Sequence, residues 1–467
     1  MEQRLSGQQS DAREGRAGER GNPPYHPRLV RKLKRAAVSL PFILLAALLV
    51  RLIAAWGYTH VRPSHALGII PFLFEPGNIA YALATGHGFS SPFRIHTGPT
   101  AWMTPVYPLL LAGIFHVFGI YTYSSFVAAA FCNILFSALA TIPIFFIGQR
   151  LGGRALAITA AWLWAVFPNA IVMPYRAIWD ASLSALLASG ILWATLALAE
   201  SKRWRGWWAY GVLWGFTLMT NPTIGALLPL LLAWIAWRRW KQSHWLVGPL
   251  LAIAIAGLCC VPWTVRNYRT FHTLVPLRSV LGLQLWMGNN DQVGHRWPGV
   301  LHPITNSAER AEYIRMGEIA YMHHKRDEAL HFITSHPAKE VRLIAIRFVA
   351  TWTGGSERPI WDFLFAYSWW LRFVLLFNLF AAAGTALGIV LLNRSGSPYA
   401  FPVVVVPVVY PLISYVSLAS PRYRHPIDPV ILLLTAVSVL WVFQSRQKIG
   451  MRGQRSPASP QAAAPSM

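Results

Sequence analysis

The chain has 467 residues, of which 55% are hydrophobic and 12% carry a charged side chain, with a formal net charge of +24. Soluble globular proteins average roughly 45–50% and about 25% for these two classes, so the composition excludes a set of ordinary soluble domains. More than half of the Lys and Arg residues lie at the chain ends and in short turns between apolar segments. This distribution favours membrane topology over nucleic-acid binding.

The first 35 residues are polar and rich in Gly, Arg and Glu, without apolar periodicity. We predict that residues 1–35 form a disordered, basic cytoplasmic N-terminus. The apolar segment that follows is longer than the core of a signal peptide, and no small-residue cleavage site comes after it. We therefore interpret it as a retained first membrane helix.

Apolar segments close to the ~20 residues needed to cross a bilayer follow one another along the chain. Segment 207–237 is long enough for two helices hinged at Asn221 and Pro222. The other predicted spans are 36–57, 120–148, 155–173, 180–199, 246–264, 367–392, 399–418 and 428–443. They predict an all-α, polytopic transmembrane helix bundle of about ten spans, which forms one domain over residues 36–445.

Basic residues set the orientation of these spans. They stand in four short turns, marked by Arg150 and Arg154, by Lys202, Arg203 and Arg205, by Arg238, Arg239 and Lys241, and by Arg394. If all four turns are cytoplasmic, the spans between them come in pairs, and residues 446–467 form a basic cytoplasmic tail. The Pro-interrupted stretch 104–119 is too short to cross the bilayer, so we expect an interfacial helix there.

This topology leaves three loops on the other side of the membrane: 58–119, 265–366 and 419–427. The second loop is the largest and contains an amphipathic segment around residues 310–347. Because the soluble mass lies on one side, we expect an active site on the extracytoplasmic face of the inner (cytoplasmic) membrane.

Acidic residues are rare in the first two thirds of the chain: between Glu19 and Asp291 there are only Glu75, Asp180 and Glu200. Glu75 and Asp180 fall at the predicted outer membrane boundary, where a carboxylate is costly and indicates function. Asp180 also opens a predicted helix, so a capping role is an equal alternative. We expect partial desolvation to hold the pKa of Glu75 at or above its ordinary value.

Two arginines, Arg422 and Arg424, stand between Pro421 and Pro426 in the short third outer loop. Guanidinium groups bind phosphate in a bidentate fashion, so we interpret the pair as a phosphate site, with snorkelling to the interface as the alternative. Arg266, at the outer end of a predicted span, is a further cationic candidate.

Other catalytic patterns are absent from the sequence. It has no Ser nucleophile elbow and no phosphate-binding Gly-rich loop after a strand, and its His residues lack metal-ligand spacing. The three cysteines lie in apolar segments and indicate neither a disulfide framework nor a zinc site. We therefore expect no metal and no cofactor.

Three blocks carry a family resemblance. The first outer loop contains FEPGNIA (74–80), ATGHGFSSPF (84–93) and GPTAWMTPVYP (98–108). Further blocks are PWTVRN (262–267) with GNN (288–290), and RYRHPIDP (422–429). In this order they resemble bacterial GT-C glycosyltransferases, the relatives of protein mannosyltransferases, of the aminoarabinose transferase and of rhizobial lipopolysaccharide-core galacturonosyltransferases. The resemblance extends over residues 36–445.

The resemblance implies a GT-C type fold and a catalytic acid in the first outer loop, which is Glu75, with Asp180 as the second acid. It also implies arginines that hold the phosphate of a lipid carrier, here Arg422 and Arg424, with Arg266 beside them. Candidate substrate-loop residues are Tyr423, His87 and Asn289. Many relatives carry an Asp or an Asp-Glu pair where this chain has a single Glu, which weakens the case for a divalent metal.

The expected reaction is the inverting transfer of a sugar from a polyprenyl-phosphate donor to a lipid, glycan or protein acceptor. Glu75 would act as general base, and cationic side chains would stabilise the leaving phosphate. Two alternatives stay open: a transporter or flippase for lipid-linked glycans, and a non-catalytic membrane subunit that binds lipid.

Overall fold

The computed structural model describes residues 38–453 except for 177, 202, 294–297 and 355–368. The predicted N-terminal segment 1–35 and the last part of the predicted tail, 454–467, lie outside the described residues. Within the described part every regular element is a helix, and β-structure is limited to an isolated bridge between Ser90 and Pro99. The all-α prediction is confirmed.

Six helical stretches of the described chain are long and apolar enough to cross a membrane. They involve α2 (Leu40–Val61), α5 (Tyr123–Leu139) with α6 (Thr141–Val166), α8 (Ala181–Leu198), α11 (Val247–Phe271), α17 (Trp369–Arg394) and α21 (Asp428–Gly453). Shorter helices complete the bundle: α7 (Pro168–Arg176), α9 (Trp204–Leu218), α10 (Leu228–Arg239), α18 (Ala400–Val409) and α19 (Leu412–Val416). The chain is thus the polytopic helix bundle that the sequence predicts.

The α5–α6 stretch is a hairpin rather than one rod. Gly152 and Gly153 interrupt α6 with non-helical angles, and Gly153 has a φ of 75°, which a residue with a Cβ adopts only with strain. The two arms touch, because a Cβ placed on Gly148 would lie 2.8 Å from the Cα of Ala157. The turn falls between Arg150 and Arg154, as the pairing of basic turns requires.

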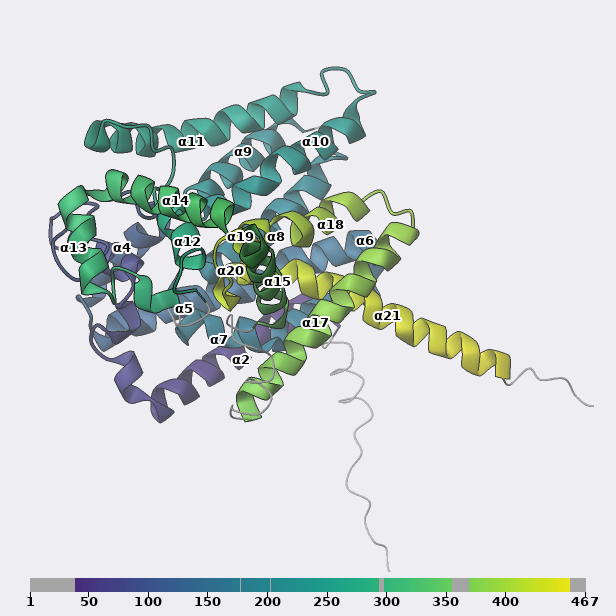
Figure 1. Cartoon of the computed structure of the whole chain (residues 1–467). Coiled ribbons are helices and arrows are strands. Elements are labelled where there is room, and N and C mark those ends of the chain that lie inside the picture. The colour runs from purple at the N-terminus through teal and green to yellow at the C-terminus, as the bar shows by residue number, and fades with distance from the viewer. Residues whose placement is uncertain (1–37, 177, 202, 294–297, 355–368, 454–467) are drawn as a thin grey trace, which may run out of the picture.

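The turns that carry basic residues meet at one end of the bundle. Arg150 binds Glu200 with an Nη1–Oε2 distance of 3.1 Å, and Tyr399, from the turn between α17 and α18, contacts the same carboxylate. Arg239 donates to the carbonyl of Leu198, at 3.0 Å. In Figure 1 the turns between α10 and α11 and between α17 and α18 lie on the right, opposite α13 and α14.

A hinge separates α9 from α10. The 3-10 helix η3 (Pro222–Leu227) begins at the proline, which lacks the N–H that a continuous helix would need. The side chain of Asn221 caps it by accepting a hydrogen bond from the backbone N–H of Thr223, at 3.2 Å. This bend, which the sequence predicts, turns Asn221 away from the helix axis.

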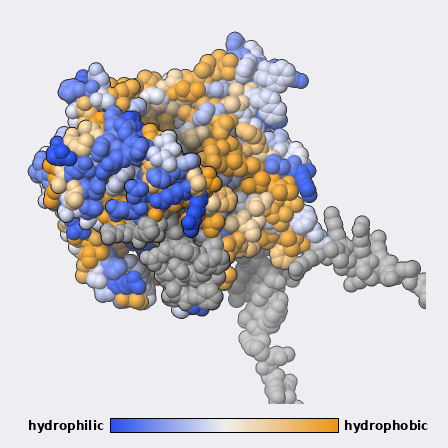
Figure 2. Space-filling model, in the orientation of Figure 1, coloured by the Kyte–Doolittle hydropathy of each residue, from blue (hydrophilic) through white to orange (hydrophobic). Residues whose placement is uncertain are grey.

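The outer segments build a cap on the opposite end. The first loop contains η1 (Pro63–Ala66), η2 (Ile70–Phe72), α3 (Glu75–Ala84) and α4 (Val106–Phe118). The second loop contains α12 (Leu281–Gly288), η4 (Pro298–Leu301), α13 (Ser307–Met316), α14 (Glu318–Ser335) and α15 (Pro337–Thr353). The third loop contains α20 (Pro421–Arg424) and η5 (His425–Ile427). Helix α4 has 13 residues, fewer than a span needs. Figure 2 shows hydrophilic residues gathered over α13 and α14, beside the largely hydrophobic surface of the bundle.

A buried carboxylate joins the first and second outer loops. Glu318 is 5% exposed and accepts hydrogen bonds from the backbone N–H of Ala101, from Ser279 Oγ and from Tyr313 Oη, each at 2.7 Å. Thr100 donates to the same carboxylate. Because the donors come from both loops, the two loops form one unit.

Candidate active site

A cavity of 690 Å³ lies between the outer segments and the adjoining ends of the bundle helices. Its polar wall includes six side chains: Glu75, Asp180, Arg278, His302, Arg422 and Tyr423. Its apolar wall includes Trp102, Trp179, Leu283, Met287, Ile413 and Leu418. Carboxylates, guanidinium groups and a broad apolar surface therefore share one space.

Glu75 is the first residue of α3, where the exposed N–H groups and dipole of a helix favour a negative charge. The residue is 4% exposed. Its Oε1 lies 2.9 Å from His302 Nε2, whereas Oε2 is buried without a hydrogen-bond partner among the described residues. One carboxylate oxygen is thus anchored and the other is free.

The pKa of Glu75 differs from the sequence-based expectation. Burial alone would raise the pKa, but the electrostatic interaction with His302, which includes the hydrogen bond from its Nε2, and the positive charge of Arg422 outweigh it, so the pKa lies below its ordinary value. The expectation of a pKa at or above that value considered desolvation alone and is wrong.

Asp180 immediately precedes α8 but does not cap it, since no hydrogen bond joins its side chain to the first turn of backbone N–H groups. Its Oδ2 accepts a hydrogen bond from Ser184 Oγ at 3.2 Å. Burial raises the pKa of Asp180, against the opposing charges of Arg422 and Arg278. The capping alternative therefore does not account for this carboxylate.

Arg422 lies on α20 with its guanidinium plane over an aromatic ring. The guanidinium carbon is 3.6 Å from the ring centroid of Trp179, and Nη2 donates to Tyr423 Oη at 3.0 Å. Stacking occupies the face of a guanidinium group and leaves its edge of N–H donors available. Arg422 and Tyr423 both line the cavity, as the predicted site requires.

Arg278 is a cavity residue that sequence reasoning missed. It lies between α11 and α12, and its Nη2 donates to Thr223 Oγ1 at 2.8 Å. Burial lowers the pKa of Arg278, with Asp180 acting in the opposite direction. Only its position in the second predicted outer loop could have indicated a role in the site. No motif in the neighbouring sequence distinguishes Arg278 from the other basic residues of that loop. His302 was missed for the same reason.

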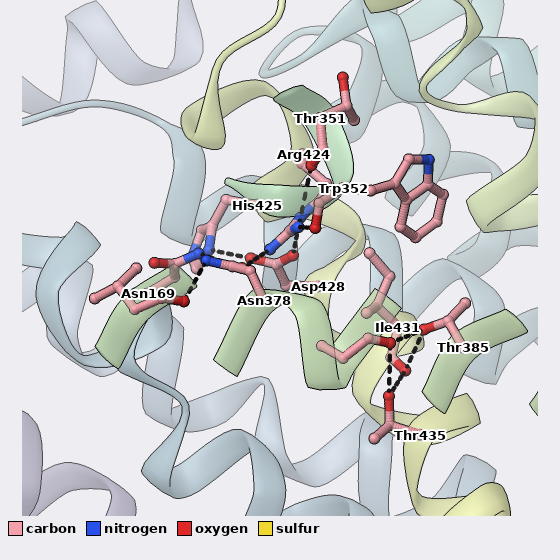
Figure 3. Close-up of polar contacts among 12 residues, drawn as sticks. Asn169, Thr351, Trp352, Asn378, Thr385, Arg424, His425, Asp428, Ile431 and Thr435 are labelled. Atoms are coloured by element: carbon pink, nitrogen blue, oxygen red, sulfur yellow. Dashed lines mark hydrogen bonds and ion pairs between the residues drawn. The ribbon is translucent and has the colours of Figure 1, made fainter. Parts of the chain in front are cut away.

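Arg424 is not among the residues that line the cavity, which corrects its assignment to the donor phosphate. Figure 3 shows it instead among its protein partners. Its Nε pairs with Asp428 Oδ1 at 2.8 Å, and Nη1 donates to the carbonyls of Thr351 and Trp352 at 3.1 and 3.0 Å. Its Nη2 donates to Asn378 Oδ1. All three nitrogens have protein partners, so this guanidinium joins α15, α17 and α21.

Arg266 is also used within the protein. Nη1 donates to the carbonyl of Thr100 at 2.7 Å and Nη2 to that of Phe89 at 2.6 Å. The guanidinium carbon lies 5.0 Å from the ring centroid of Trp263. Arg266 thus fastens the first outer loop to α11 instead of lining the cavity, which corrects its assignment to the donor.

The two remaining substrate-loop candidates lie elsewhere. His87 Nδ1 is 2.9 Å from Thr85 Oγ1, and the ring is not part of the cavity wall. Asn289 is fully buried and accepts a hydrogen bond from Arg347 Nη2 at 3.0 Å. Its role is structural, because its amide also donates to the carbonyl of Val416 at 2.8 Å.

Where side chains are described, no three His, Cys, Asp or Glu residues come close enough together to hold a metal ion. Glu75 contacts His302, and Asp180 interacts electrostatically with Arg422 and Arg278. The positive charges of the cavity wall come from arginine side chains, namely Arg176, Arg278 and Arg422.

Part of the sequence matches a known family. Residues 102–265 match the family model described as dolichyl-phosphate-mannose-protein mannosyltransferase. This segment runs from the first outer loop through the hinge to α11, and it includes Trp102, Asp180 and Asn221 of the cavity. No curated protein matches the sequence.

Three solved structures are similar to this chain at low sequence identity, and two of them, both from one archaeon, reach a TM-score of at least 0.50. The oligosaccharyltransferase of Archaeoglobus fulgidus with zinc and sulfate is 13% identical, with a TM-score of 0.51, over 88% of this chain and 49% of that chain. The same organism's AglB with an inhibitory peptide and a dolichol-phosphate is 14% identical, with a TM-score of 0.50, over 89% and 52%. ArnT from Cupriavidus metallidurans bound to undecaprenyl phosphate is 13% identical, with a TM-score of 0.37, over 89% and 80%.

The chain is a multi-pass helical membrane protein whose fold is similar to that of the archaeal oligosaccharyltransferase, and part of its sequence matches a mannosyltransferase family model. The resemblance to GT-C glycosyltransferases is thereby confirmed. The chain spans about half the length of the archaeal oligosaccharyltransferase.

Proposed function

We propose that this chain is a glycosyltransferase that moves a sugar from a polyprenyl-phosphate donor to an acceptor, with inversion at the anomeric carbon. One observation carries the proposal. The 690 Å³ cavity combines two carboxyl groups, the buried Glu75 and the partly buried Asp180, with the guanidinium groups of Arg278 and Arg422. An enzyme that releases a phosphate while activating a hydroxyl or amine needs both kinds of group in one place.

The donor phosphate would bind between Arg422 and Arg278. Arg422 presents its guanidinium edge, and such an edge binds phosphate in a bidentate fashion. The apolar wall, with Leu283, Ile413 and Leu418, would accept the first units of the prenyl chain. This binding mode is supported by the dolichol-phosphate found with the archaeal AglB, whose fold the chain shares.

The chemical step is a single displacement. The acceptor's oxygen or nitrogen attacks the anomeric carbon, a bond to that carbon forms, and the bond from carbon to the phosphate oxygen breaks. The electron pair leaves with the polyprenyl phosphate, whose charge Arg278 and Arg422 stabilise. Glu75 takes the acceptor's proton, which its low pKa allows because the carboxyl group is ionised at neutral pH.

Asp180 would serve as an orienting group. It interacts electrostatically with both Arg278 and Arg422, so it holds the two cations toward the same space. If Glu75 proves dispensable, Asp180 is the next candidate for the base. The proposed acceptor is a lipid, glycan or protein presented from the extracytoplasmic face.

The positions of the basic turns support an active site on the extracytoplasmic side of the membrane. They gather at the end of the bundle opposite the cavity cap, and the positive-inside rule assigns such an end to the cytoplasm. Single cysteines placed in the turn beside Gly153 and in the exposed part of α13 should be labelled from opposite sides of inner-membrane vesicles. Labelling of both from the same side would contradict this orientation.

Function is tested with purified protein in proteoliposomes and a panel of isotopically labelled polyprenyl-phosphate sugars. A glycosyltransferase releases polyprenyl phosphate and attaches the label to an acceptor from an envelope extract. Label that crosses the bilayer while still linked to its carrier would identify a transporter. Label that binds without crossing or reacting would identify a non-catalytic subunit.

A further inference from the structure

The imidazole of His302 bridges two different partners. On one side its Nε2 lies 2.9 Å from Glu75 Oε1, and on the other its Nδ1 lies 3.1 Å from the backbone nitrogen of Ile304. The side chain is 15% exposed. The rings of Phe93 and Trp102 meet it nearly edge-on, with centroids at 6.2 and 5.4 Å, which limits rotation of the imidazole.

These contacts determine which ring nitrogen carries the proton. A backbone N–H can only donate, so Nδ1 of His302 must accept from Ile304 and is unprotonated. The imidazole proton is therefore on Nε2 and is donated to Glu75 Oε1.

The same geometry separates the two oxygens of Glu75. Oε1 already accepts the hydrogen bond from His302, whereas Oε2 is buried and has no partner among the described residues. A proton arriving from an acceptor on the cavity side would bind Oε2 without breaking an existing contact. A buried acceptor without a partner is costly, which indicates that a ligand donor completes it.

We propose that His302 is a positioning residue for the base: its Nε2–H fixes the Glu75 carboxylate so that Oε2 is the atom that receives the acceptor's proton. The proposal rests on the proposed function. It adds a residue from the second outer loop to a base in the first.

Two substitutions divide the functions of the two ring nitrogens. His302→Gln places an amide N–H near the former Nε2, so it keeps the donor to Glu75 and loses the acceptor for Ile304. His302→Asn places its oxygen near the former Nδ1, so it keeps the contact with Ile304 and loses the donor. If His302 positions the base, kcat should fall roughly tenfold or more in H302N and stay within about threefold in H302Q, with KM for the donor little changed.

The pH profile gives a second readout. A hydrogen bond to an ionised carboxylate lowers its pKa, so its loss in H302N should move the acidic limb of kcat/KM upward by about half a unit or more. The other charged groups of the cavity wall, namely Arg176, Arg278, Arg422 and Asp180, are the same in both variants. H302Q should keep the limb close to that of the wild type.

The tautomer can be read without turnover. In NMR spectra of protein labelled with 15N-histidine, the signals of His302 are those that disappear in H302Q. Their chemical shifts should be those of an unprotonated Nδ1 and a protonated Nε2. A protonated Nδ1 would overturn the assignment even if transfer is observed. Absence of transfer in the wild type with the expected tautomer would overturn the proposed function and leave the contact standing. A larger loss of kcat in H302Q than in H302N would show that His302 only anchors its own loop.

Discussion

Arg422 and Arg424 stand two positions apart in one short loop, yet they belong to different regions of the molecule. Arg422 lies in the cavity with its face on Trp179 and one hydrogen bond to Tyr423. Arg424 lies in a buried network in which every nitrogen of its guanidinium has a protein partner. The comparison shows that a positive charge alone does not make an arginine a binding residue. The guanidinium group must also have N–H donors that the protein itself does not use.

The two regions should respond differently to mutation, and the largest effect is expected in the network. Arg424→Gln removes one of the two partners of the fully buried Asp428 carboxylate and leaves it only His425, and breaking a buried pair costs about 3–5 kcal/mol. Thermal unfolding in detergent should show a midpoint lower by several degrees. Arg422→Gln is the matched control and should leave the midpoint nearly unchanged. Equal destabilisation by the two variants would contradict the distinction between the regions.

In the cavity the largest expected effect is on rate. Glu75→Gln keeps the size of the side chain but cannot accept a proton, so turnover should fall by roughly 10²-fold or more while donor affinity changes little. Asp327→Asn, which alters an exposed acid on α14, serves as control. Wild-type turnover in Glu75→Gln would make Asp180 the candidate base. A parallel loss of rate, affinity and folding would assign Glu75 a structural role.

A smaller effect is expected on donor binding. Each hydrogen bond to a charged group contributes about 1.5–3 kcal/mol, so Arg422→Gln should weaken binding of a polyprenyl phosphate by roughly ten- to a hundredfold. Arg422→Lys should restore only part of this, because an ammonium group lacks the planar edge. Binding measured by calorimetry in detergent checks both variants. Unchanged affinity in Arg422→Gln would exclude Arg422 from the phosphate site.

The mildest test is the pH dependence of the wild-type enzyme. The base must be ionised, and interactions with His302 and Arg422 hold the pKa of Glu75 below its ordinary value of about 4.3. Activity should therefore stay level as the pH falls from neutrality and be lost only in the range below that value. The pKa of Asp180 is raised by burial, so an acidic limb well above the ordinary Asp value would identify Asp180 as the base.

Sequence reasoning succeeded where the cause is local. The length of an apolar segment predicts a membrane-spanning helix, and the residues Asn221 and Pro222 themselves predict the hinge between α9 and α10. It also selected Glu75, Asp180 and Arg422, which the fold places around one cavity. The fold class and its GT-C type could be predicted because these features repeat along the whole chain.

It failed where the partners come from distant segments. Whether Arg424 is available depends on the carbonyls of α15 and on Asn378 of α17, and no local pattern reports their approach. The opposite error concerns Arg278 and His302, which become site residues only because the second loop folds over the first. The low pKa of Glu75 was missed for the same reason, since its cause is His302, 227 positions along the chain.

The carboxylate of Glu318 has a consequence for how a ligand would enter and leave. It ties the first outer loop to α13, α14 and the segment before α12, so neither loop can swing open by itself without losing several buried hydrogen bonds. The wall that bears Glu75 and the wall that bears His302 would have to move as a rigid lid. A long lipid would then exchange along the bilayer side of the cavity, and the catalytic geometry would persist between turnovers.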